Sequence, residues 1–556
     1  MSERPASKAT VPPASGIRPG GNIIPGTISG PRNAAREVWV EVPRPEGLPS
    51  AWCYSDRRAY RSGDEVLLYL SANVDQVTIR IYRDALDKHV VHVSEVMAAA
   101  FQPVPDRAYE VGCDWPEFLR WQTPADLASG GYIVEISQAG GTVIGHHFFV
   151  VRARKHEPGT MALVLATSTW AAYNDWGGAN HYYGLNTPNP RGRSPILAAN
   201  RPWARGQIWL PEGAPRTVNA QRPTKPGPAR YEAVEWAFLN GYTKYYSFAG
   251  WATHERPFLH WAERQGYAFD ILTQDELHAE PGVLDTYACT VFVGHDEYWS
   301  WEMREAVDRY VDAGGRVARF AGNFLWQIRL EQDQQRQLAY KYDARSLDPL
   351  AQADPVPQTI TSAWEDPLVG YPGAATFGVN ALRGVYAGFG AMASRAARGF
   401  NTFRPDHWSF VGTGLGYADM FGDEANIFGY EMDGLDYTFT DGLPVPTYTD
   451  GAPEGIQILA MGWATLAETG RAEDAYSFML GDGDARYRDA LLGDGSAASL
   501  AKNSRGSGMV VHFTRGAGEV YTAGTCEWVN GLIQGDFYTE TITKNVLDRF
   551  SGKTAN

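Results

Sequence analysis

The sequence predicts an α/β protein with a doubly wound, mainly parallel sheet, preceded by an immunoglobulin-like antiparallel β-sandwich. Two observations lead to this prediction. Residues 36–156 hold short alternating or β-branched runs that are separated by turn signals. From residue 157 onward, uninterrupted apolar runs alternate with amphipathic segments, and this order is typical of a parallel sheet with helices on both faces.

The chain begins with an arm and then the predicted sandwich. Residues 1–35 are rich in Pro, Gly, Ser and Ala without periodicity, so we predict that they form a flexible arm. The strands expected over 36–156 are WVEV, EVLLYLSA, VTIRIYR, YIVEIS and HHFFVV, with turn glycines in SGDE and ASGG. About 120 residues of this kind are typical of an immunoglobulin-like sandwich, whose expected role is packing or docking.

The predicted α/β domain spans residues 157–556. Its first strand is expected in MALVLATST, and the helix in ERPFLHWAERQG ends at Gly266. The strands YAFDILT and CTVFVG follow, and then come the amphipathic helix WEMREAVDRYVDAGG and the strand RVARFAG. Residues 350–480 are rich in Gly, Asp and Pro and are predicted to be insertions. A hairpin is expected near 509–524, and TETITKNVLDRF predicts a closing helix.

Charge and composition exclude several classes of function. The net charge is −15, from 49 Lys and Arg against 64 Asp and Glu, and this disfavours binding to a nucleic-acid backbone. No apolar run of about 18 residues predicts a membrane span, and the N-terminus lacks the apolar core of a secretory signal. The four cysteines are scattered without a CxxC pair, which favours free thiols. We therefore expect a soluble, cytoplasmic, multidomain protein.

Polar side chains collect where three of the predicted parallel strands end. In an open parallel sheet, ligands bind beyond the carboxyl ends of the strands. The strand MALVLATST is followed by WAAYNDWGGANHYYG, CTVFVG by HDEYW, and RVARFAG by NFLW. This rule places one set of side chains on the same rim: Tyr173, Tyr182, Tyr183, His295, Asp296, Glu297, Tyr298 and Asn323.

The chemistry of this rim favours a hard metal ion. No glycine-rich phosphate loop and no GxSxG elbow follows a strand. Carboxylate and phenol oxygens suit hard cations such as Mg²⁺, Mn²⁺ or Fe³⁺. A phenolate ligand needs a strong Lewis acid, because the reference pKa of tyrosine is about 10, and this requirement points to ferric iron. Each group alone also has a structural explanation, such as loop packing, a helix N-terminus or a turn.

Five segments carry a resemblance to a known family. In chain order, WAAYNDWGGANHYYG, RPFLHWAERQGY, VGHDEYW, RFAGNFLWQIR and FGYEMDG resemble the large (β) subunit of the N,N-dimethylformamidase family. The resemblance covers roughly residues 155–550 and extends weakly into the preceding sandwich. It implies a glutamine-amidotransferase-like sheet and an amidohydrolase that holds one ferric ion with two tyrosines and one glutamate.

The resemblance assigns the metal ligands residue by residue. The first tyrosine falls on Tyr173 of AAYN, and the glutamate falls on Glu297 of GHDEYW. We assign the second tyrosine to Tyr183 of HYYGLN, with Tyr182 as its rival, since the family has a different string and a longer insertion here. The expected cofactor is one mononuclear Fe(III) on Tyr173, Tyr183 and Glu297.

The resemblance also assigns four residues to catalysis. His295 of GHDEYW and Asn323 of AGNF match active-site positions of the family, as do Lys341 of AYKYD and Glu431 of GYEMD. In the expected mechanism Glu431 takes a proton from water, and His295 or Lys341 protonates the departing amine. Asn323 donates a hydrogen bond to the developing oxyanion.

The expected reaction is hydrolysis of the C–N bond of a small amide similar to N,N-dimethylformamide, giving dimethylamine and formate. Two alternatives stay open: a related hydrolase of another formamide, urea or carbamate, and a non-catalytic binding protein with an inactive α/β domain. A redox role of the iron ranks below hydrolysis, because three anionic ligands favour Fe(III).

The expected partners follow from the resemblance as well. The family's large subunit carries an extra lectin-like N-terminal domain and works with a small helical subunit, whereas a short arm precedes the sandwich here. We expect a homo-oligomer that binds a small amide substrate, and a small helical subunit stays open as a partner.

Overall fold

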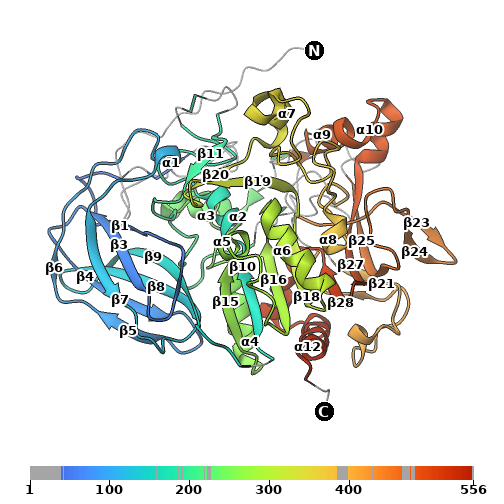
Figure 1. Ribbon diagram of the computed structural model, residues 1–556, viewed down its shortest axis with the longest axis horizontal. Coiled ribbons are helices and arrows are strands. Elements are labelled where there is room, and N and C mark those ends of the chain that lie inside the picture. Colours follow the sequence, from blue (N-terminus) through green and yellow to red (C-terminus); the bar gives the residue numbers. More distant parts are fainter. Residues whose placement is uncertain are drawn as a thin grey trace.

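The structure is a computed structural model, and it describes most of the chain (Figure 1). The predicted arm at residues 1–35 lies outside the described residues. The described residues are 39–41, 43–157, 159–185, 187–188, 192–217, 220–221, 227–228, 230–384, 399–428, 431–465, 476–477 and 483–553.

Two small sheets form the N-terminal part of the described chain, at the left of Figure 1. Their facing sides enclose an apolar core, which includes Leu68 of β3 and Ile79 of β4. One sheet has the order β1 (Ala51–Ser55), β3 (Glu65–Ala72), β7 (Glu117–Gln122). The other has the order β2 (Ala59–Arg61), β9 (Val143–Arg152), β8 (Gly130–Gln138), β4 (Gln76–Arg83), β5 (His89–Val93), with β6 (Met97–Ala98) paired to β4. The helix α1 (Ala108–Val111) lies between β6 and β7 in sequence.

A nine-stranded sheet forms the centre of the described structure. Its first five strands pair in parallel, and the remaining ones pair in an antiparallel manner. Its order is β15 (Phe269–Thr273), β10 (Met161–Leu165), β16 (Cys289–His295), β18 (Arg316–Gly322), β28 (Gly518–Ala523), β27 (Arg505–Arg515), β25 (Gln457–Thr465), β21 (Phe400–Thr402), β22 (Met420–Phe421). Part of the segment predicted to be insertions therefore extends this sheet as β21, β22 and β25.

Helices cover both faces of the central sheet. Alternate side chains of β10 enter different cores: Leu163 packs in one with α4 and α12, and Val164 packs in the other with α5 and α6. This alternation explains why the strands are uninterrupted apolar runs. The helices are α2 (Thr167–Tyr173), α3 (Glu232–Asn240), α4 (Glu255–Arg264), α5 (Gln274–Ala279), α6 (Trp301–Asp312), α7 (Ala344–Leu347), α8 (Ala374–Phe377), α9 (Gly483–Leu492), α10 (Ala497–Asn503), α11 (Trp528–Gln534) and α12 (Phe537–Ser551).

Short sheets and turns flank the central sheet. One has the order β11 (Ile196–Ala198), β20 (Arg336–Leu338), β19 (Trp326–Glu331), β17 (Tyr298–Ser300). The pairs are β12 (Ala220–Gln221) with β14 (Arg230–Tyr231), β13 (Gly227–Pro228) with β26 (Tyr476–Ser477), and β23 (Tyr437–Thr440) with β24 (Leu443–Pro446). In the described part of the chain, 3-10 turns cover Lys341–Asp343, Pro349–Gln352 and Trp408–Phe410.

Several local predictions are confirmed. The segments ERPFLHWAERQG, WEMREAVDRYVDAGG and TETITKNVLDRF contain α4, α6 and most of α12, and residues 509–524 lie in the hairpin of β27 and β28. The four cysteines are free and buried. The immunoglobulin-like and glutamine-amidotransferase-like assignments, and the domain boundaries, stay predictions.

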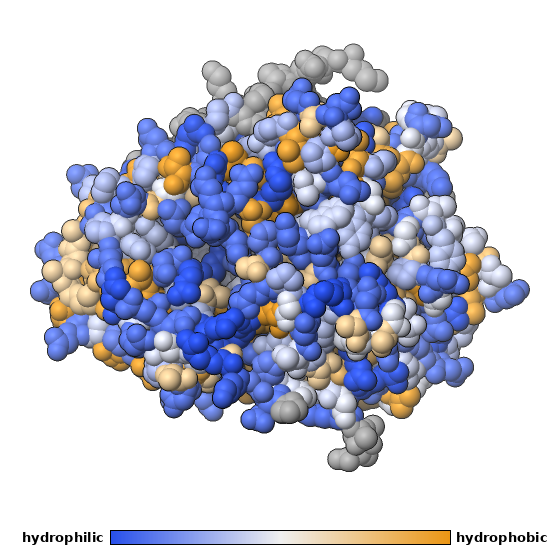
Figure 2. Space-filling model, viewed as in Figure 1, coloured by the Kyte–Doolittle hydropathy of each residue, from blue (hydrophilic) through white to orange (hydrophobic). Residues whose placement is uncertain are grey.

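Hydrophobic side chains are concentrated in the interior. Figure 2 shows a mostly hydrophilic face over which hydrophobic residues are scattered in small groups. Among the described helices, none has both the length and the apolar composition that crossing a bilayer requires.

Candidate active site

Most of the predicted site residues meet beyond the carboxyl ends of the parallel strands, as the rule for open sheets requires. Tyr173 is the last residue of α2, the helix that directly follows β10, and His295 is the last residue of β16. Asn323 follows β18. Glu431 adjoins Met432, which forms an isolated bridge to Thr525 just after β28.

The carboxylate of Glu297 is the centre of a hydrogen-bond cluster. Tyr173 donates its hydroxyl to Oε2 at 2.8 Å, and the hydroxyl of Tyr182 lies 2.7 Å from Oε1 and 2.6 Å from Oε2. The indole of Trp326 donates to Oε1 at 2.7 Å. The hydroxyl of Tyr298 in turn donates to that of Tyr182 at 2.8 Å. Two phenols and one carboxylate thus converge on a single point.

The second predicted ligand tyrosine, Tyr183, does not reach this cluster. Its hydroxyl donates to the backbone oxygen of Trp39 at 2.6 Å and to Oδ2 of Asp175 at 3.2 Å. The neighbouring residue, Tyr182, occupies the position that the sequence prediction gave to Tyr183. The geometry therefore differs from the prediction and favours the rival, because the two side chains leave the loop toward different partners.

Asn180 fixes this loop, and the sequence analysis did not single it out. Its Oδ1 accepts the backbone N–H groups of Tyr182 and Tyr183 at 2.8 and 3.0 Å. Its Nδ2 donates to the backbone oxygen of Tyr173 at 3.1 Å. An asparagine that binds the backbone two residues onward is typical of a tight turn, and this signal was present in ANHYY. Asn180 thereby holds the two site tyrosines together.

A second cluster lies beside Glu297 and contains three predicted catalytic residues. Nε2 of His295 lies 2.8 Å from Oε2 of Glu431 and 3.4 Å from Oε2 of Glu297. Nδ2 of Asn323 lies 2.9 Å from Oε2 of Glu431 and 3.0 Å from Nε2 of His295. The other ring nitrogen of His295 lies 2.9 Å from the backbone oxygen of Phe248, which orients the ring so that Nε2 faces the carboxylates.

Lys341 adds a positive charge to the cluster. Its ammonium group lies 3.4 Å from the ring centroid of Tyr182 and 5.3 Å from that of Trp326. Lys341 and Asn323 both have left-handed backbones, with φ of 58° and 67°. A left-handed backbone is uncommon for lysine and more common for asparagine.

Burial and charge set the protonation of the site. Burial favours neutral His295, but the carboxylates of Glu431 and Glu297 outweigh it and raise the pKa of His295 to about 10. Burial favours protonated Glu297, but the hydrogen bond from His295 and the charge of Lys341 lower its pKa overall. Burial and the charge of Glu297 raise the pKa of Tyr182 well above its ordinary value. Without a cation the phenol stays protonated beside an ionised carboxylate.

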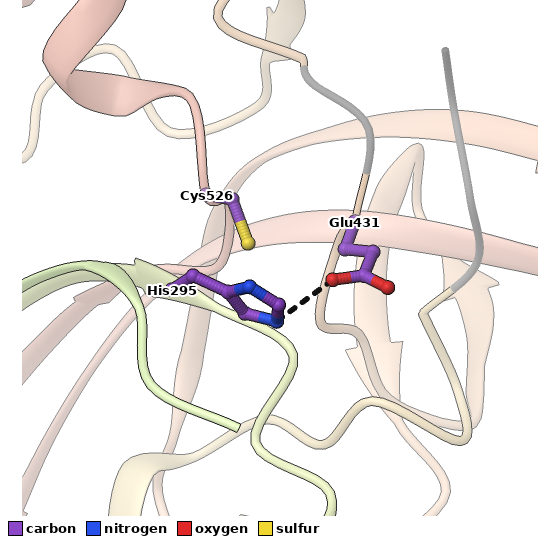
Figure 3. A group of neighbouring side chains, drawn as sticks. All are labelled: His295, Glu431 and Cys526. Carbon is purple, nitrogen blue, oxygen red and sulfur yellow. Dashed lines mark ion pairs between the residues drawn. The ribbon is translucent and has the colours of Figure 1, made fainter. Parts of the chain in front are cut away.

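Cys526 completes a further group of potential ligands (Figure 3). Its sulfur, a carboxylate oxygen of Glu431 and a ring nitrogen of His295 all lie within 4.8 Å of one another and are buried. Figure 3 shows the thiol and the carboxylate directed toward the imidazole ring. Burial and the charge of Glu431 raise the pKa of Cys526 well above its ordinary value, so without a metal the sulfur is a neutral thiol.

The cluster around Glu297 fits a hard cation better than the group with Cys526. Two phenol oxygens and a carboxylate are hard donors that match ferric iron, whereas sulfur and imidazole suit softer metals. A cation among these oxygens would take the place of the phenolic protons that now bind Glu297. The residues present therefore fit the iron site that the resemblance implies.

The site includes two residues whose role the sequence did not reveal. Tyr298 was placed on the rim without a role, and its hydroxyl donates to that of Tyr182. Trp326 was assigned no role, and its indole donates to Glu297. A sequence rich in aromatic residues does not show which tyrosine hydroxyl or tryptophan N–H forms a hydrogen bond, because the same residue types also serve only for packing.

Comparisons with known proteins identify a family for this chain. A family model described as "N,N-dimethylformamidase beta subunit-like, C-terminal" matches residues 78–540, which is more than half of the chain. A search of curated proteins finds no match. One solved structure, the sporulation control protein Spo0M from Bacillus subtilis, aligns at 12% identity with a TM-score of 0.13. That alignment covers 20% of this chain and 52% of Spo0M, and it carries no argument about fold or function.

Proposed function

The chain belongs to the N,N-dimethylformamidase beta subunit-like family, and from this premise we propose that it is an iron-dependent hydrolase. It cleaves the C–N bond of a small amide similar to N,N-dimethylformamide, and water converts this amide to formate and dimethylamine. The observation that carries the proposal is the convergence of the Tyr173 and Tyr182 hydroxyls on the Glu297 carboxylate at 2.6–2.8 Å.

Tyr173, Tyr182 and Glu297 hold the ferric ion in this proposal, and Tyr182 replaces Tyr183 as the second tyrosine. A bound ferric ion supplies Lewis acidity that polarises an amide carbonyl and acidifies water. The lysine at 3.4 Å from the Tyr182 ring, Lys341, offsets the negative charge that tyrosinates would add.

His295, Glu431 and Asn323 move and orient the protons of the reaction. Glu431 takes a proton from the attacking water, and His295, whose Nε2 lies 2.8 Å from that carboxylate, gives its proton to the departing amine. Both proton transfers are needed, because an amine leaves poorly as an anion unless it receives a proton. The amide of Asn323 contacts both side chains and can turn its N–H to the developing oxyanion, an interaction worth about 10²–10³ in rate at similar sites.

The first experiment is metal analysis of the protein purified from iron-containing medium, together with its visible spectrum. We expect one iron per site and a charge-transfer band from tyrosinate bound to Fe(III). Removal of the iron by a chelator should abolish both the colour and the release of amine. A colourless protein without iron would overturn the metal assignment.

A pair of variants separates the two groups of potential ligands. Glu297→Gln should lose iron, because it removes an anionic carboxylate that both phenols contact. Cys526→Ala should keep iron, because its thiol lies outside the oxygen cluster. If Cys526→Ala loses iron and Glu297→Gln keeps it, the metal site is instead assigned to the group of His295, Glu431 and Cys526.

A panel of small amides defines the reaction. We expect the iron-loaded protein to release dimethylamine from N,N-dimethylformamide. Turnover of a urea or a carbamate alone would instead support a related hydrolase. An iron-loaded protein that releases amine from no member of the panel would support a binding protein.

A further inference from the structure

A fully buried cluster of three charges lies beneath the strand ends that carry the site. Arg319, on β18, is 0% exposed, and its partners Asp296 and Asp433 are 1% and 0% exposed. The guanidinium donates to Asp296 through Nε at 2.9 Å and Nη2 at 2.6 Å. Its remaining nitrogen, Nη1, lies 2.8 Å from Oδ2 of Asp433. One arginine therefore joins two aspartates that are far apart in the sequence.

Each aspartate adjoins residues of the proposed site. Asp296 lies between His295 and Glu297 in the sequence, and Asp433 follows Glu431 by two positions. The backbone oxygen of Asp296 accepts the indole N–H of Trp299 at 2.7 Å, so this segment is held on both sides. The ion pairs thus connect the segment that bears Glu297 to the segment that bears Glu431.

Asp433 also holds the third segment of the site. Its Oδ1 accepts the backbone N–H of Asn323 at 2.8 Å, and both of its oxygens lie 3.3 Å from the backbone nitrogen of Phe324. Asn323 has a φ of 67°, in the left-handed region that glycine and asparagine adopt more readily than other residues. The carboxylate of Asp433 is a direct partner of this left-handed backbone.

We propose that Arg319, Asp296 and Asp433 form a positioning cluster, which keeps Glu297, Asn323 and Glu431 in their mutual geometry. The catalytic consequence of this cluster rests on the proposed function, whereas the geometry of the cluster does not depend on that function. Buried ion pairs add little stability over well-packed apolar residues, but in some proteins they restrict the fold to one arrangement. Groups in a catalytic site need such restriction, because a shift of about 1 Å can cost about 10²-fold in rate.

Asp433→Asn and Arg319→Lys test the proposal in the iron-loaded protein. Asparagine keeps the size of Asp433 and an acceptor for the N–H of Asn323, and lysine keeps the charge of Arg319 without its three-way contact. We expect kcat to fall about 10- to 100-fold with the iron content retained, KM changed less than kcat, and the charge-transfer band shifted. Asp433→Ala, which also removes the acceptor, should be worse than Asp433→Asn.

Arg152→Lys is the matched control. Arg152 also joins two carboxylates, at 3.3 Å from Glu276 and 3.0 Å from Glu280, but it lies on β9, in contact with α5 and the residue that follows it. The Arg152→Lys variant should have a lower thermal midpoint but an unchanged kcat and visible spectrum. The comparison is made between variants that lose the same amount of thermal midpoint. If Asp433→Asn and Arg319→Lys then lower kcat no more than Arg152→Lys does, the cluster is only a core ion pair and the proposal is overturned.

A structural measurement separates this proposal from the proposed function. A crystal structure of Asp433→Asn should show Asn323 leaving the left-handed region or the contact of His295 with Glu431 lengthened from 2.8 Å. An unchanged site would overturn the positioning role. A wild-type protein without iron or turnover would defeat the proposed function while leaving this test in force.

Discussion

Glu297 is the residue on which the chemistry of the site depends, because three aromatic side chains donate hydrogen bonds to its two carboxylate oxygens. Tyr173, Tyr182 and Trp326 all contact it within 2.8 Å. A carboxylate that is saturated by hydrogen bonds stays ionised in a buried place. It is therefore ready to bind a cation, provided that the phenols can exchange their protons for it.

The tyrosine pair gives the sharpest test at this scale. Tyr182→Phe removes a hydroxyl that contacts Glu297, and we expect at least about 10-fold weaker iron binding and loss of most of the visible colour. Tyr183→Phe, its neighbour and matched control, removes contacts to Trp39 and Asp175 only. It should keep the iron and lose about 1 kcal/mol of stability.

Iron titration of both variants at equal protein concentration measures the difference. A Tyr183→Phe protein that loses its colour while Tyr182→Phe keeps it would restore the original sequence assignment. Equal iron binding by both would remove the second tyrosine from the ligand set.

At the scale of elements, strand β9 shows how burial on two faces shapes the chemistry of single residues. Phe148 and Val150 pack with the core that α4 and α12 share, whereas Phe149 and Val151 pack inside the N-terminal sheets. His147 stands among these residues at 3% exposure, with Nε2 at 2.9 Å from the hydroxyl of Ser55. Burial lowers the pKa of His147 from 6.5 to about 3.

From the lowered pKa of His147 we predict that the protein loses stability in acid. Below pH 6.5 the unfolded chain binds a proton at this position that the folded chain does not bind until about pH 3. The free energy of unfolding should therefore decrease as the pH is lowered through this window, by about 1.4 kcal/mol per pH unit for this one group. His147→Gln should show a smaller slope than the wild type in urea unfolding measured between pH 6.5 and pH 4.

Ser55→Ala is the control for this prediction. Burial is the cause of the lowered pKa of His147, so removal of the Ser55 hydroxyl should leave the slope unchanged even if it lowers stability at every pH. Identical slopes for His147→Gln and the wild type would show that His147 is not protonated in the unfolding step.

At the scale of the whole molecule, the N-terminal sheets and the central sheet share one core. Ile133 and Phe148 belong to the same apolar cluster as Leu163 and Phe258. A buried polar contact crosses the junction as well, since Asp84 accepts the indole N–H of Trp251 and the guanidinium Nε of Arg256, each at 2.7 Å. The two parts should therefore unfold together.

Calorimetry tests this coupling. We expect one unfolding transition, and Asp84→Ala should lower its midpoint, because the change leaves the indole of Trp251 unpaired at a cost of about 1–3 kcal/mol. Asp87→Ala, an exposed aspartate in the same turn, should leave the midpoint in place. Two separate transitions in the wild type, of which Asp84→Ala shifts one, would contradict a shared core.

Predictions from the sequence differ in quality for physical reasons. The amphipathic helices α4, α6 and α12 and the hairpin of β27 and β28 follow from local periodicity and turn residues, and they were predicted. The sequence predicts insertions where the structure has the strands β21, β22 and β25, because their pairing partners lie far away in sequence and short strands carry weak local signals. Association with further copies or with a small helical subunit stays a prediction.

The sequence by itself determined which residue types stand at the strand ends, because burial on both faces forces apolar runs and leaves polar residues where the strands stop. It thus placed Tyr173, His295, Glu297 and Asn323 on one rim. Only the tertiary structure decided that Tyr182 turns toward Glu297 while Tyr183 turns toward the backbone oxygen of Trp39. That choice depends on the hydrogen bonds of Asn180 to the backbone of the loop and on partners more than 100 residues away in the chain.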